Sequence, residues 1–215
     1  MTSSRSWRAV LFDWDGTLVD TAEASFRSYV RMFETFGIPF DRARYAETYS
    51  PDWHHTYRSV GLPGNRWSDA DRVWLDFFAG EEAALIEGAA DALRALTNRG
   101  IIVGLVTSGG RERVSRELTL LEVAAHFAHV VCGDDGPRRK PHPDALQHAL
   151  EKLSVAPDEA AYVGDSPEDV QMAKAANVFA VAVPGAYPNA EALRAASPDL
   201  IASDLADAVR QLIGE

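Results

Sequence analysis

The segment Ala9–Leu18, with the sequence AVLFDWDGTL, constrains the fold of this chain more than any other. Its apolar first part has the length of a β-strand and ends abruptly in two carboxylates, Asp13 and Asp15, followed by Gly16 and Thr17. Asp and Gly form ordinary turns, but ligands of α/β proteins also bind at the carboxyl ends of strands. Two carboxylates crowded there repel one another unless a cation or a shared proton accompanies them. The segment therefore predicts a buried strand that delivers two acidic side chains to a ligand site.

Short apolar stretches alternate with helical patterns through residues 88–215. The expected strands are Ile101–Val106, Val130–Cys132, Ala160–Val163 and Phe179–Val183. The expected helices are Ala90–Asn98, Arg111–Leu121, Asp144–Leu153 and Pro167–Ala176. This alternation is typical of βαβ units, so it predicts an α/β protein with a parallel sheet. With the strand at Ala9–Phe12, the sheet has at least five strands.

Residues 21–86 interrupt this alternation. Helical patterns cover Ala22–Phe36, Arg42–Thr48, Asp52–Val60 and Ser68–Leu85, and no convincing strand lies among them. A simple crossover needs one helix, whereas four helical patterns indicate an inserted domain. We therefore expect a discontinuous α/β core domain, residues 1–19 and 87–215, and an all-helical cap domain, residues 20–86.

The composition restricts the partners. Hydrophobic residues make up 47% of the chain, the net charge is −11, and no cluster of basic residues stands out. These features argue against binding a nucleic acid backbone or an anionic membrane. No apolar run approaches the roughly 20 residues of a membrane helix, and the segment Met1–Arg8 lacks the apolar core of a signal peptide. With the single cysteine Cys132 expected in a buried strand, we expect a cytoplasmic protein, and the sequence leaves any oligomeric partner open.

Polar residues follow three further stretches of the predicted sheet. Thr107–Gly110 follows the second strand, Lys140 follows a polar loop after the third, and Asp165 and Asp169 follow the fourth. Lys140 is one of three lysines, against 18 arginines, in the chain. Because the carboxyl ends of parallel strands meet at one edge of the sheet, we expect these side chains to converge near Asp13.

Each of these segments has a second interpretation. Lys140 directly follows Arg138 and Arg139, so it either lies in a solvated basic turn or reaches the site. Thr107–Gly110 either begins a helix with Ser108 as its N-cap, or presents backbone amides and glycines to an anion. Asp169 stands at the capping-box position of a helix whose N-cap is Ser166. Asp165 precedes that cap, so capping does not require it.

Together the residues fit phosphoryl transfer. The carboxylates of Asp13 and Asp165, with the backbone carbonyl of Asp15, offer the oxygen ligands that Mg²⁺ prefers. Thr107 and Lys140 supply a hydroxyl group and a cation for the oxygens of a phosphoryl group. One carboxylate can act as a nucleophile and form an aspartyl-phosphate. The carboxylate of Asp15 is then free to protonate the leaving oxygen and later to deprotonate water.

Four motifs resemble, in order and spacing, those of the haloacid dehalogenase superfamily. They are Asp13–Thr17, Thr107–Ser108, Lys140–Pro141 and Gly164–Asp169, and the resemblance spans Val10–Val183. The helical insertion directly after the first motif is similar to that of the subfamily containing phosphoglycolate phosphatases. The resemblance implies a doubly wound parallel sheet of strand order 3-2-1-4-5, with the first strand in the centre.

The resemblance also implies roles for the motif residues. Asp13 becomes the nucleophile and Asp15 the general acid and base. Thr107 and Lys140 hold the phosphoryl group, and Asp165 completes a Mg²⁺ site with these two aspartates. Asp169 supports the metal through water or Ser166. Ser108 and Gly109 lie beside the substrate, although many relatives have Asn where this chain has Ser108.

Other chemistries of the superfamily fit less well. Dehalogenases lack an acid at the position of Asp15, and phosphonatases need a cap lysine, whereas residues 21–86 contain none. Related mutases carry a histidine where Ser25 stands. Receiver domains share the acidic residues, Thr or Ser, and Lys, but carry their phospho-acceptor on a later strand and have no helical cap. We therefore expect a Mg²⁺-dependent phosphatase acting on a small organic phosphomonoester, such as phosphoglycolate or a sugar phosphate. A phosphotransferase or phosphomutase of the same fold and a catalytically silent phosphate-binding regulator remain the alternatives.

The cap segment Tyr49–Arg58 is the candidate for substrate selection. It combines aromatic rings with two histidines and an arginine, of which His54 and Arg58 are the expected substrate contacts. The alternative is ordinary packing, because Trp53 and Tyr57 recur at helical spacing and suit a cap core.

Overall fold

The computed structural model describes residues 6–50, 53–136 and 138–215. The chain divides into two compact units: Met1–Asp20 with Ala84–Glu215, and Thr21–Ala83. The first unit holds all strands that the structure describes, and the second consists of helices and their connections. The second unit lies within the range expected for the cap, residues 20–86.

The first unit is built on a parallel sheet of six strands in the order β3-β2-β1-β4-β5-β6. The strands are β1 (Ala9–Phe12), β2 (Ile102–Val106), β3 (His129–Val131), β4 (Ala160–Gly164), β5 (Phe179–Ala182) and β6 (Leu200–Ile201). The predicted order of the first five strands, with β1 in the centre, is confirmed. The edge strand β6 was not predicted, because its two residues are too short to leave an apolar pattern.

The central strand β1 is buried on both faces. All four of its residues are completely buried. Side chains alternate between the faces of a strand, and Ala9 and Leu11 belong to one core cluster, together with Tyr162 of β4. Val10 and Phe12 therefore point to the opposite face. This explains why the segment is apolar at every position and does not alternate with polar residues.

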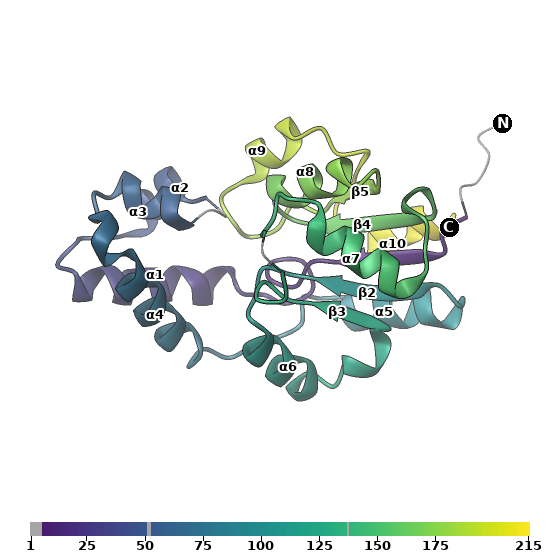
Figure 1. Cartoon of the computed structure of the whole chain (residues 1–215), viewed down its shortest axis with the longest axis horizontal. Coiled ribbons are helices and arrows are strands. Elements are labelled where there is room, and N and C mark those ends of the chain that lie inside the picture. Colours follow the sequence, from purple (N-terminus) through teal and green to yellow (C-terminus); the bar gives the residue numbers. More distant parts are fainter. Residues whose placement is uncertain (1–5, 51–52, 137) are drawn as a thin grey trace. The chain divides into compact units, whose positions relative to one another are not determined.

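Helices cover both faces of this sheet (Figure 1). In chain order they are α5 (Ala89–Asn98), α6 (Arg111–Leu120), α7 (Asp144–Leu153), α8 (Pro167–Ala175), α9 (Ala190–Ala195) and α10 (Leu205–Ile213). Helices α7, α8 and α9 contribute to the core cluster that contains Leu11, whereas α5 packs against β2 and α10. Short 3₁₀ turns lie at Ala124–His126 and Pro157–Glu159. Helices α9 and α10 were not among the expected helices.

The helical unit contains α1 (Ala22–Thr35), α2 (Arg42–Thr48), α3 (Trp53–Ser59) and α4 (Trp67–Phe78), with a 3₁₀ turn at Gly64–Arg66. Its core is largely aromatic, and includes Tyr29, Phe33, Phe40, Tyr45 and Tyr57. The expected helix Ser68–Leu85 is wrong at its end, because the helix stops at Phe78. The expected helix start at Asp52 lies outside the described residues.

The two connections between the units run beside each other. Val19 forms an antiparallel bridge with Leu85, and the amide of Asp20 donates to the carbonyl of Ala84 at 2.9 Å. The amide of Ile86 donates to the carbonyl of Leu18 at the same distance. Leu85 was expected to continue a helix, but this pairing places it in an extended connection.

Two further expectations concern Cys132 and the membrane. Cys132 is buried directly after β3, and burial raises the pKa of its thiol to about 11. The cysteine is therefore a packed side chain and not a reactive thiolate.

None of the helices in the described part of the chain has both the length and the apolar character to cross a membrane.

Truncation of the central strand should destabilise the protein. Leu11→Ala removes a completely buried side chain from the core cluster, so we expect the free energy of unfolding to fall by about 2 to 5 kcal/mol. Chemical denaturation measures this loss. Leu120→Ala, at a side chain that is 68% exposed on α6, is the control and should change stability by less than about 0.5 kcal/mol. Equal effects of the two substitutions would contradict the assignment of the core.

Candidate active site

Three strand ends bring the predicted polar residues together. Asp13 directly follows β1, and its amide donates to the carbonyl of Val163 in β4 at 2.9 Å. Thr107 follows β2, and Asp165 follows β4. Asp13, Thr107 and Asp165 are all buried. The hydrogen bonds of the sheet thus fix the backbone positions of these residues without a bound ligand.

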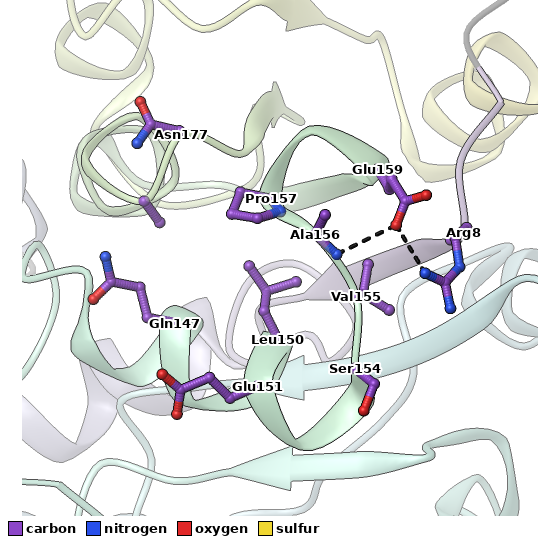
Figure 2. Close-up of a pocket in the computed structure, with 11 residues that line it drawn as sticks. Arg8, Gln147, Leu150, Glu151, Ser154, Val155, Ala156, Pro157, Glu159 and Asn177 are labelled. Carbon is purple, nitrogen blue, oxygen red and sulfur yellow. Dashed lines mark hydrogen bonds and ion pairs between the residues drawn. The ribbon is translucent and has the colours of Figure 1, made fainter.

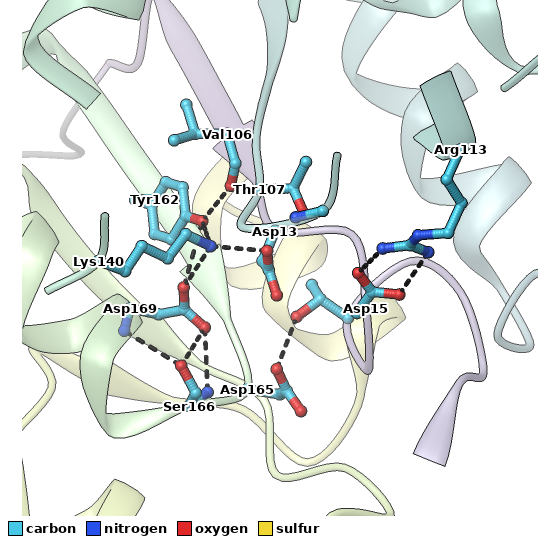
Figure 3. A network of polar contacts seen from close by, with 12 residues as sticks. Asp13, Asp15, Val106, Thr107, Arg113, Lys140, Tyr162, Asp165, Ser166 and Asp169 are labelled. Carbon is cyan, nitrogen blue, oxygen red and sulfur yellow. Dashed lines mark hydrogen bonds and ion pairs between the residues drawn. The ribbon is translucent and has the colours of Figure 1, made fainter. Parts of the chain in front are cut away.

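The Lys140 ammonium lies between Asp13, Tyr162 and Asp169 (Figure 3). Its ammonium donates to Asp13 Oδ1 at 2.6 Å and to Tyr162 Oη and Asp169 Oδ1, both at 2.7 Å. An ammonium has three N–H groups, so all three are committed in this arrangement. Lys140 is therefore placed to neutralise the carboxylates. Its expected contact with a phosphoryl group stays a prediction and requires one of these bonds to be exchanged.

Tyr162 is a site residue that the sequence analysis missed. Its side chain is buried in β4, and its hydroxyl donates to the carbonyl of Val106 at 2.7 Å while accepting from Lys140. Val106 precedes Thr107, so the phenol ties the ends of β2 and β4 to the lysine. Buried tyrosine hydroxyls usually find such a partner. The available signal was a tyrosine in an otherwise small and apolar strand.

Three buried carboxylates form one cluster. Oxygen atoms of Asp13, Asp165 and Asp169 all lie within 4.8 Å of one another. Thr17 Oγ1 donates to Asp165 Oδ1 at 3.4 Å, whereas Asp165 Oδ2 is buried without a hydrogen-bond partner among the described residues. Three carboxylates against one ammonium leave an excess of negative charge. A buried oxygen without a partner in such a cluster needs a cation or a proton.

Burial dominates the protonation behaviour of this cluster. Desolvation raises the pKa of Asp13 to about 7, although the neighbouring Lys140 acts to lower it. Burial and the charges of Asp13 and Asp169 raise the pKa of Asp165 well above its usual range. A divalent cation with a preference for oxygen ligands would reverse this penalty. The donor set therefore fits Mg²⁺.

Asp169 completes the capping box of α8 and also contacts Lys140. Helix α8 begins at Pro167 behind the N-cap Ser166, whose hydroxyl accepts from the amide of Asp169 at 3.2 Å. Asp169 Oδ2 accepts from the amide and the hydroxyl of Ser166, and Oδ1 accepts from Lys140. The predicted capping box is confirmed. Both oxygens already have partners, which favours a supporting role beside a metal over direct coordination.

Asp15 points away from the carboxylate cluster. The sequence analysis had taken its carboxylate to be free, but in the structure it is bound by an arginine. Its two oxygens accept from Arg113 Nη1 at 3.0 Å and Nη2 at 2.5 Å. Arg113 lies on α6, and its side chain is only 15% exposed. The carboxylate of Asp15 is thus absent from the cluster, which leaves its backbone carbonyl as the group expected to contact a metal.

The loop Thr107–Gly110 does not begin a helix at Ser108. Helix α6 has Gly110 as its N-cap, without a side-chain cap, and Thr107 Oγ1 accepts from the amide of Gly109 at 3.0 Å. The carbonyl of Gly109 accepts from the amide of Gly133 at 2.9 Å. A Cβ atom at Gly133 would lie 2.2 Å from the Ser108 carbonyl oxygen, so only glycine permits this approach. The interpretation with Ser108 as N-cap is wrong.

Gly16 is required by the packing around Asp165. Its φ is +84°, and a Cβ atom would lie 2.3 Å from Asp165 Oδ2 and 2.8 Å from the ring of Tyr187. Asn189 Nδ2 donates to the carbonyl of Asp165 at 3.1 Å. The segment after β5 therefore supports Asp165 from behind, which sequence reasoning did not foresee because no motif extends that far.

The chain is similar to known proteins over most of its length. Residues 10–183 match the family of haloacid dehalogenase-like hydrolases. The chain belongs to this family. The phosphoglycolate phosphatase of Escherichia coli (strain K12) is 32% identical over 227 residues, which cover 93% of this chain and 90% of that protein. The pyrophosphatase PpaX of Oceanobacillus iheyensis is 28% identical and covers 95% of this chain and 96% of its own.

A solved structure supports the same assignment. The crystal structure of CbbY from Rhodobacter sphaeroides in complex with phosphate has a TM-score of 0.77 and 26% identity, with coverage of 94% of this chain and 96% of CbbY. The predicted haloacid dehalogenase superfamily, its phosphoglycolate-phosphatase-like subfamily and the enzyme class, a phosphatase, are confirmed.

His54 and Arg58 of this haloacid dehalogenase-like hydrolase lie on α3 of the helical unit. His54 stacks on Trp67 with ring centroids 4.6 Å apart, and the Arg58 guanidinium lies 5.4 Å from the same ring. Tyr57 belongs to the core of the unit, as the packing alternative predicted. The assignment of His54 and Arg58 to substrate binding stays a prediction.

A hollow of about 630 Å³ lies far from this chemistry (Figure 2). Its lining combines residues of α7 and residues after α8 with Arg8 before β1 and Glu159 before β4, and the last two form an ion pair at 2.8 Å. Arg8 and Glu159 lie at the amino ends of the strands, whereas Asp13 and Asp165 lie at the carboxyl ends. The hollow is therefore separate from the candidate site at Asp13.

The charge excess should make the metal-free protein sensitive to pH. The pKa of Asp13 is about 7 when folded and near 3.8 when unfolded, so between these values only the folded state keeps the proton. Stability therefore falls as pH rises from about 4 to 7, by an order of a few kcal/mol, since one pKa unit corresponds to about 1.4 kcal/mol.

Denaturation in the presence of a chelator measures this dependence. Asp13→Asn removes the titration of Asp13 together with its effect on the pKa of Asp165, so the difference between the two slopes reports this coupled contribution. The variant should lose that part of the slope. A wild-type slope that equals the slope of the variant would contradict the assignment.

Proposed function

We propose that this protein is a Mg²⁺-dependent phosphatase that hydrolyses a small organic phosphomonoester through an aspartyl-phosphate on Asp13. The observation that carries the proposal is the buried cluster of Asp13, Asp165 and Asp169 at the carboxyl ends of β1 and β4, in which Lys140 binds the first and the last of these carboxylates. Such a cluster combines a nucleophile with an unbalanced negative charge that a divalent cation would neutralise. This arrangement suits the binding of a phosphate dianion together with its counterion.

In the first step an oxygen of the Asp13 carboxylate attacks the phosphorus atom of the substrate. The bond between phosphorus and the leaving oxygen breaks, and the electron pair stays on that oxygen. Asp15 supplies the proton that converts the leaving oxygen into an alcohol. Lys140 holds Asp13 in place through the 2.6 Å hydrogen bond and can transfer an N–H to a phosphoryl oxygen. The Thr107 hydroxyl is placed to donate to another of these oxygens.

In the second step a water molecule attacks the phosphorus atom of the aspartyl-phosphate. The bond to the Asp13 oxygen breaks and restores the carboxylate, and inorganic phosphate is released. Asp15, which became a carboxylate in the first step, accepts the proton of the water. The proton lost by Asp15 in one step is thus recovered in the other, and the net reaction consumes one water molecule.

The proposed metal is held by Asp13, Asp165 and the backbone carbonyl of Asp15, with Asp169 in a supporting role. When bound, Mg²⁺ supplies charge neutralisation that lets a dianion approach an aspartate nucleophile. The orphaned Asp165 Oδ2 supports this assignment, because it is a buried ligand atom without another partner among the described residues.

The relatives support a proposal for the substrate class. The E. coli relative is a phosphoglycolate phosphatase, the relative from Oceanobacillus is a pyrophosphatase, and CbbY binds phosphate in its crystal structure. We propose a small acidic or sugar-like phosphomonoester as the substrate of this chain, with phosphoglycolate as the first compound to test. A phosphomutase or phosphotransferase would instead pass the phosphoryl group to an organic acceptor.

Phosphatase activity should depend on Asp13. With Mg²⁺ present, we expect steady release of inorganic phosphate from p-nitrophenyl phosphate and from phosphoglycolate. Asp13→Asn should reduce turnover by at least about 10³-fold, because the amide cannot replace the nucleophile. Asp91→Asn, at an exposed surface aspartate of α5, is the matched control and should retain full activity. Persistent turnover by Asp13→Asn, or none by the wild type, would refute the proposal.

Metal binding should be detectable without turnover. A ligand that binds only the folded state raises the stability by about 2.7 kcal/mol at a hundredfold excess over its dissociation constant. We therefore expect Mg²⁺ to raise the melting temperature of the wild type, as measured by calorimetry. Asp165→Asn should abolish most of the increase, whereas Asp91→Asn should preserve it. An undiminished increase in Asp165→Asn would place the metal elsewhere.

A further inference from the structure

A second charged network adjoins the acidic cluster at Asp15 (Figure 3). Arg113 holds both oxygens of Asp15 and also donates through Nη1 to Glu117 Oε2 at 2.9 Å. Glu117 Oε2 in turn accepts from Trp14 Nε1 at 2.7 Å. Trp14 is completely buried and lies between the two aspartates in the sequence. Hydrogen bonds therefore connect Trp14 to Glu117, Glu117 to Arg113, and Arg113 to Asp15, which follows Trp14 in the chain.

This hydrogen-bond network holds the Asp15 carboxylate in one orientation. A planar guanidinium that contacts both oxygens fixes the plane of the carboxylate as well as its position. Glu117 is one helical turn after Arg113 on α6, so the glutamate restrains the arginine, and the buried indole of Trp14 restrains the glutamate. Each group is thus supported by the next one.

The arrangement argues against Arg113 as a receptor for the substrate anion. Its guanidinium already faces two carboxylates, Asp15 and Glu117, so the formal charge of the trio is −1 when all are ionised. An additional anion would be repelled. The role of Arg113 must therefore be exerted through Asp15.

We infer that Arg113 is a positioning residue that holds the Asp15 carboxylate as the proton acceptor for hydrolysis of the aspartyl-phosphate. The inference rests on the proposed function. In the structure Asp15 is oriented as a hydrogen-bond acceptor, which is the form it has after it has given its proton to the leaving oxygen. In that form it must receive the proton of the attacking water while that water's oxygen bonds to phosphorus and the bond between phosphorus and Asp13 breaks.

The two steps differ in their need for this positioning. With p-nitrophenyl phosphate the leaving p-nitrophenolate is stable without a proton, so the first step does not require Asp15. The second step requires Asp15 for every substrate. Loss of Arg113 should therefore slow the second step selectively when this substrate is used.

Rapid mixing of the Mg²⁺-loaded enzyme with p-nitrophenyl phosphate tests the inference. In Arg113→Met we expect a burst of about one p-nitrophenolate per enzyme, followed by steady turnover about ten- to a hundredfold slower than in the wild type. Acid quenching during steady turnover should trap a phosphorylated protein that hydroxylamine cleaves, as an aspartyl-phosphate requires. Arg113→Lys, which keeps the charge but loses the two-point contact, should recover part of the steady rate.

A second variant guards against misfolding, because Arg113→Met leaves the buried Glu117 without its counter-charge. Arg113→Met combined with Glu117→Gln restores the charge balance and keeps an amide oxygen for Trp14 Nε1. This double variant should show the same burst. Arg116→Met, at an exposed arginine of the same helix, is the matched control and should behave like the wild type.

The outcomes separate the inference from the proposed function. Equal slowing of both phases in the two variants, or no change in either phase, would overturn the positioning role of Arg113 while leaving the phosphatase intact. A wild type that turns over without any trappable phosphoprotein, and an Asp13→Asn variant that stays active, would instead overturn the aspartyl-phosphate route itself and the inference with it.

Discussion

The hydrogen bonds of Lys140 to Asp13, Asp169 and Tyr162 are the interactions on which the rest of the site depends. A buried ammonium costs several kcal/mol of desolvation unless its partners are close and well oriented. Here three strand or helix ends must meet for those partners to exist, since Asp13 follows β1, Tyr162 lies in β4 and Asp169 lies in α8. The geometry of the site therefore requires that β1 and β4 are neighbours in the sheet.

The site divides its charges between two places. Lys140 faces the carboxylates that surround the proposed metal, and Arg113 faces Asp15 and Glu117. Separation of the two aspartates of the first motif reduces their mutual repulsion. It also gives each a different partner, which is how one protein can use one carboxylate as a nucleophile and another as an acid and base.

Much of this was predictable, and the exceptions have physical reasons. The buried strand at Ala9–Phe12 and the capping box at Ser166 follow from local patterns, and the structure confirms both. The five-strand order follows from the resemblance to the haloacid dehalogenase superfamily, and the structure confirms it as well. The contact of Arg113 with Asp15 was not predictable, because one arginine among 18 gives no signal until the fold brings it to the loop after β1. Tyr162 was missed because a tyrosine in a buried strand normally indicates packing. The end of α4 was misplaced because residues 79–85, with the sequence AGEEAAL, consist mostly of Ala, Glu and Leu, which favour helices.

The paired connections at Val19 and Leu85 have a consequence for how such a protein can change. The chain leaves the α/β unit and re-enters it at neighbouring backbone positions, joined by hydrogen bonds between Leu18 and Ile86 and between Asp20 and Ala84. Any inserted segment whose own ends lie close together can therefore be joined at these two connections without distorting β1, the strand that precedes Asp13. Phosphoryl chemistry and the inserted helices can then diversify separately, the first held constant by the sheet and the second exchanged as a unit.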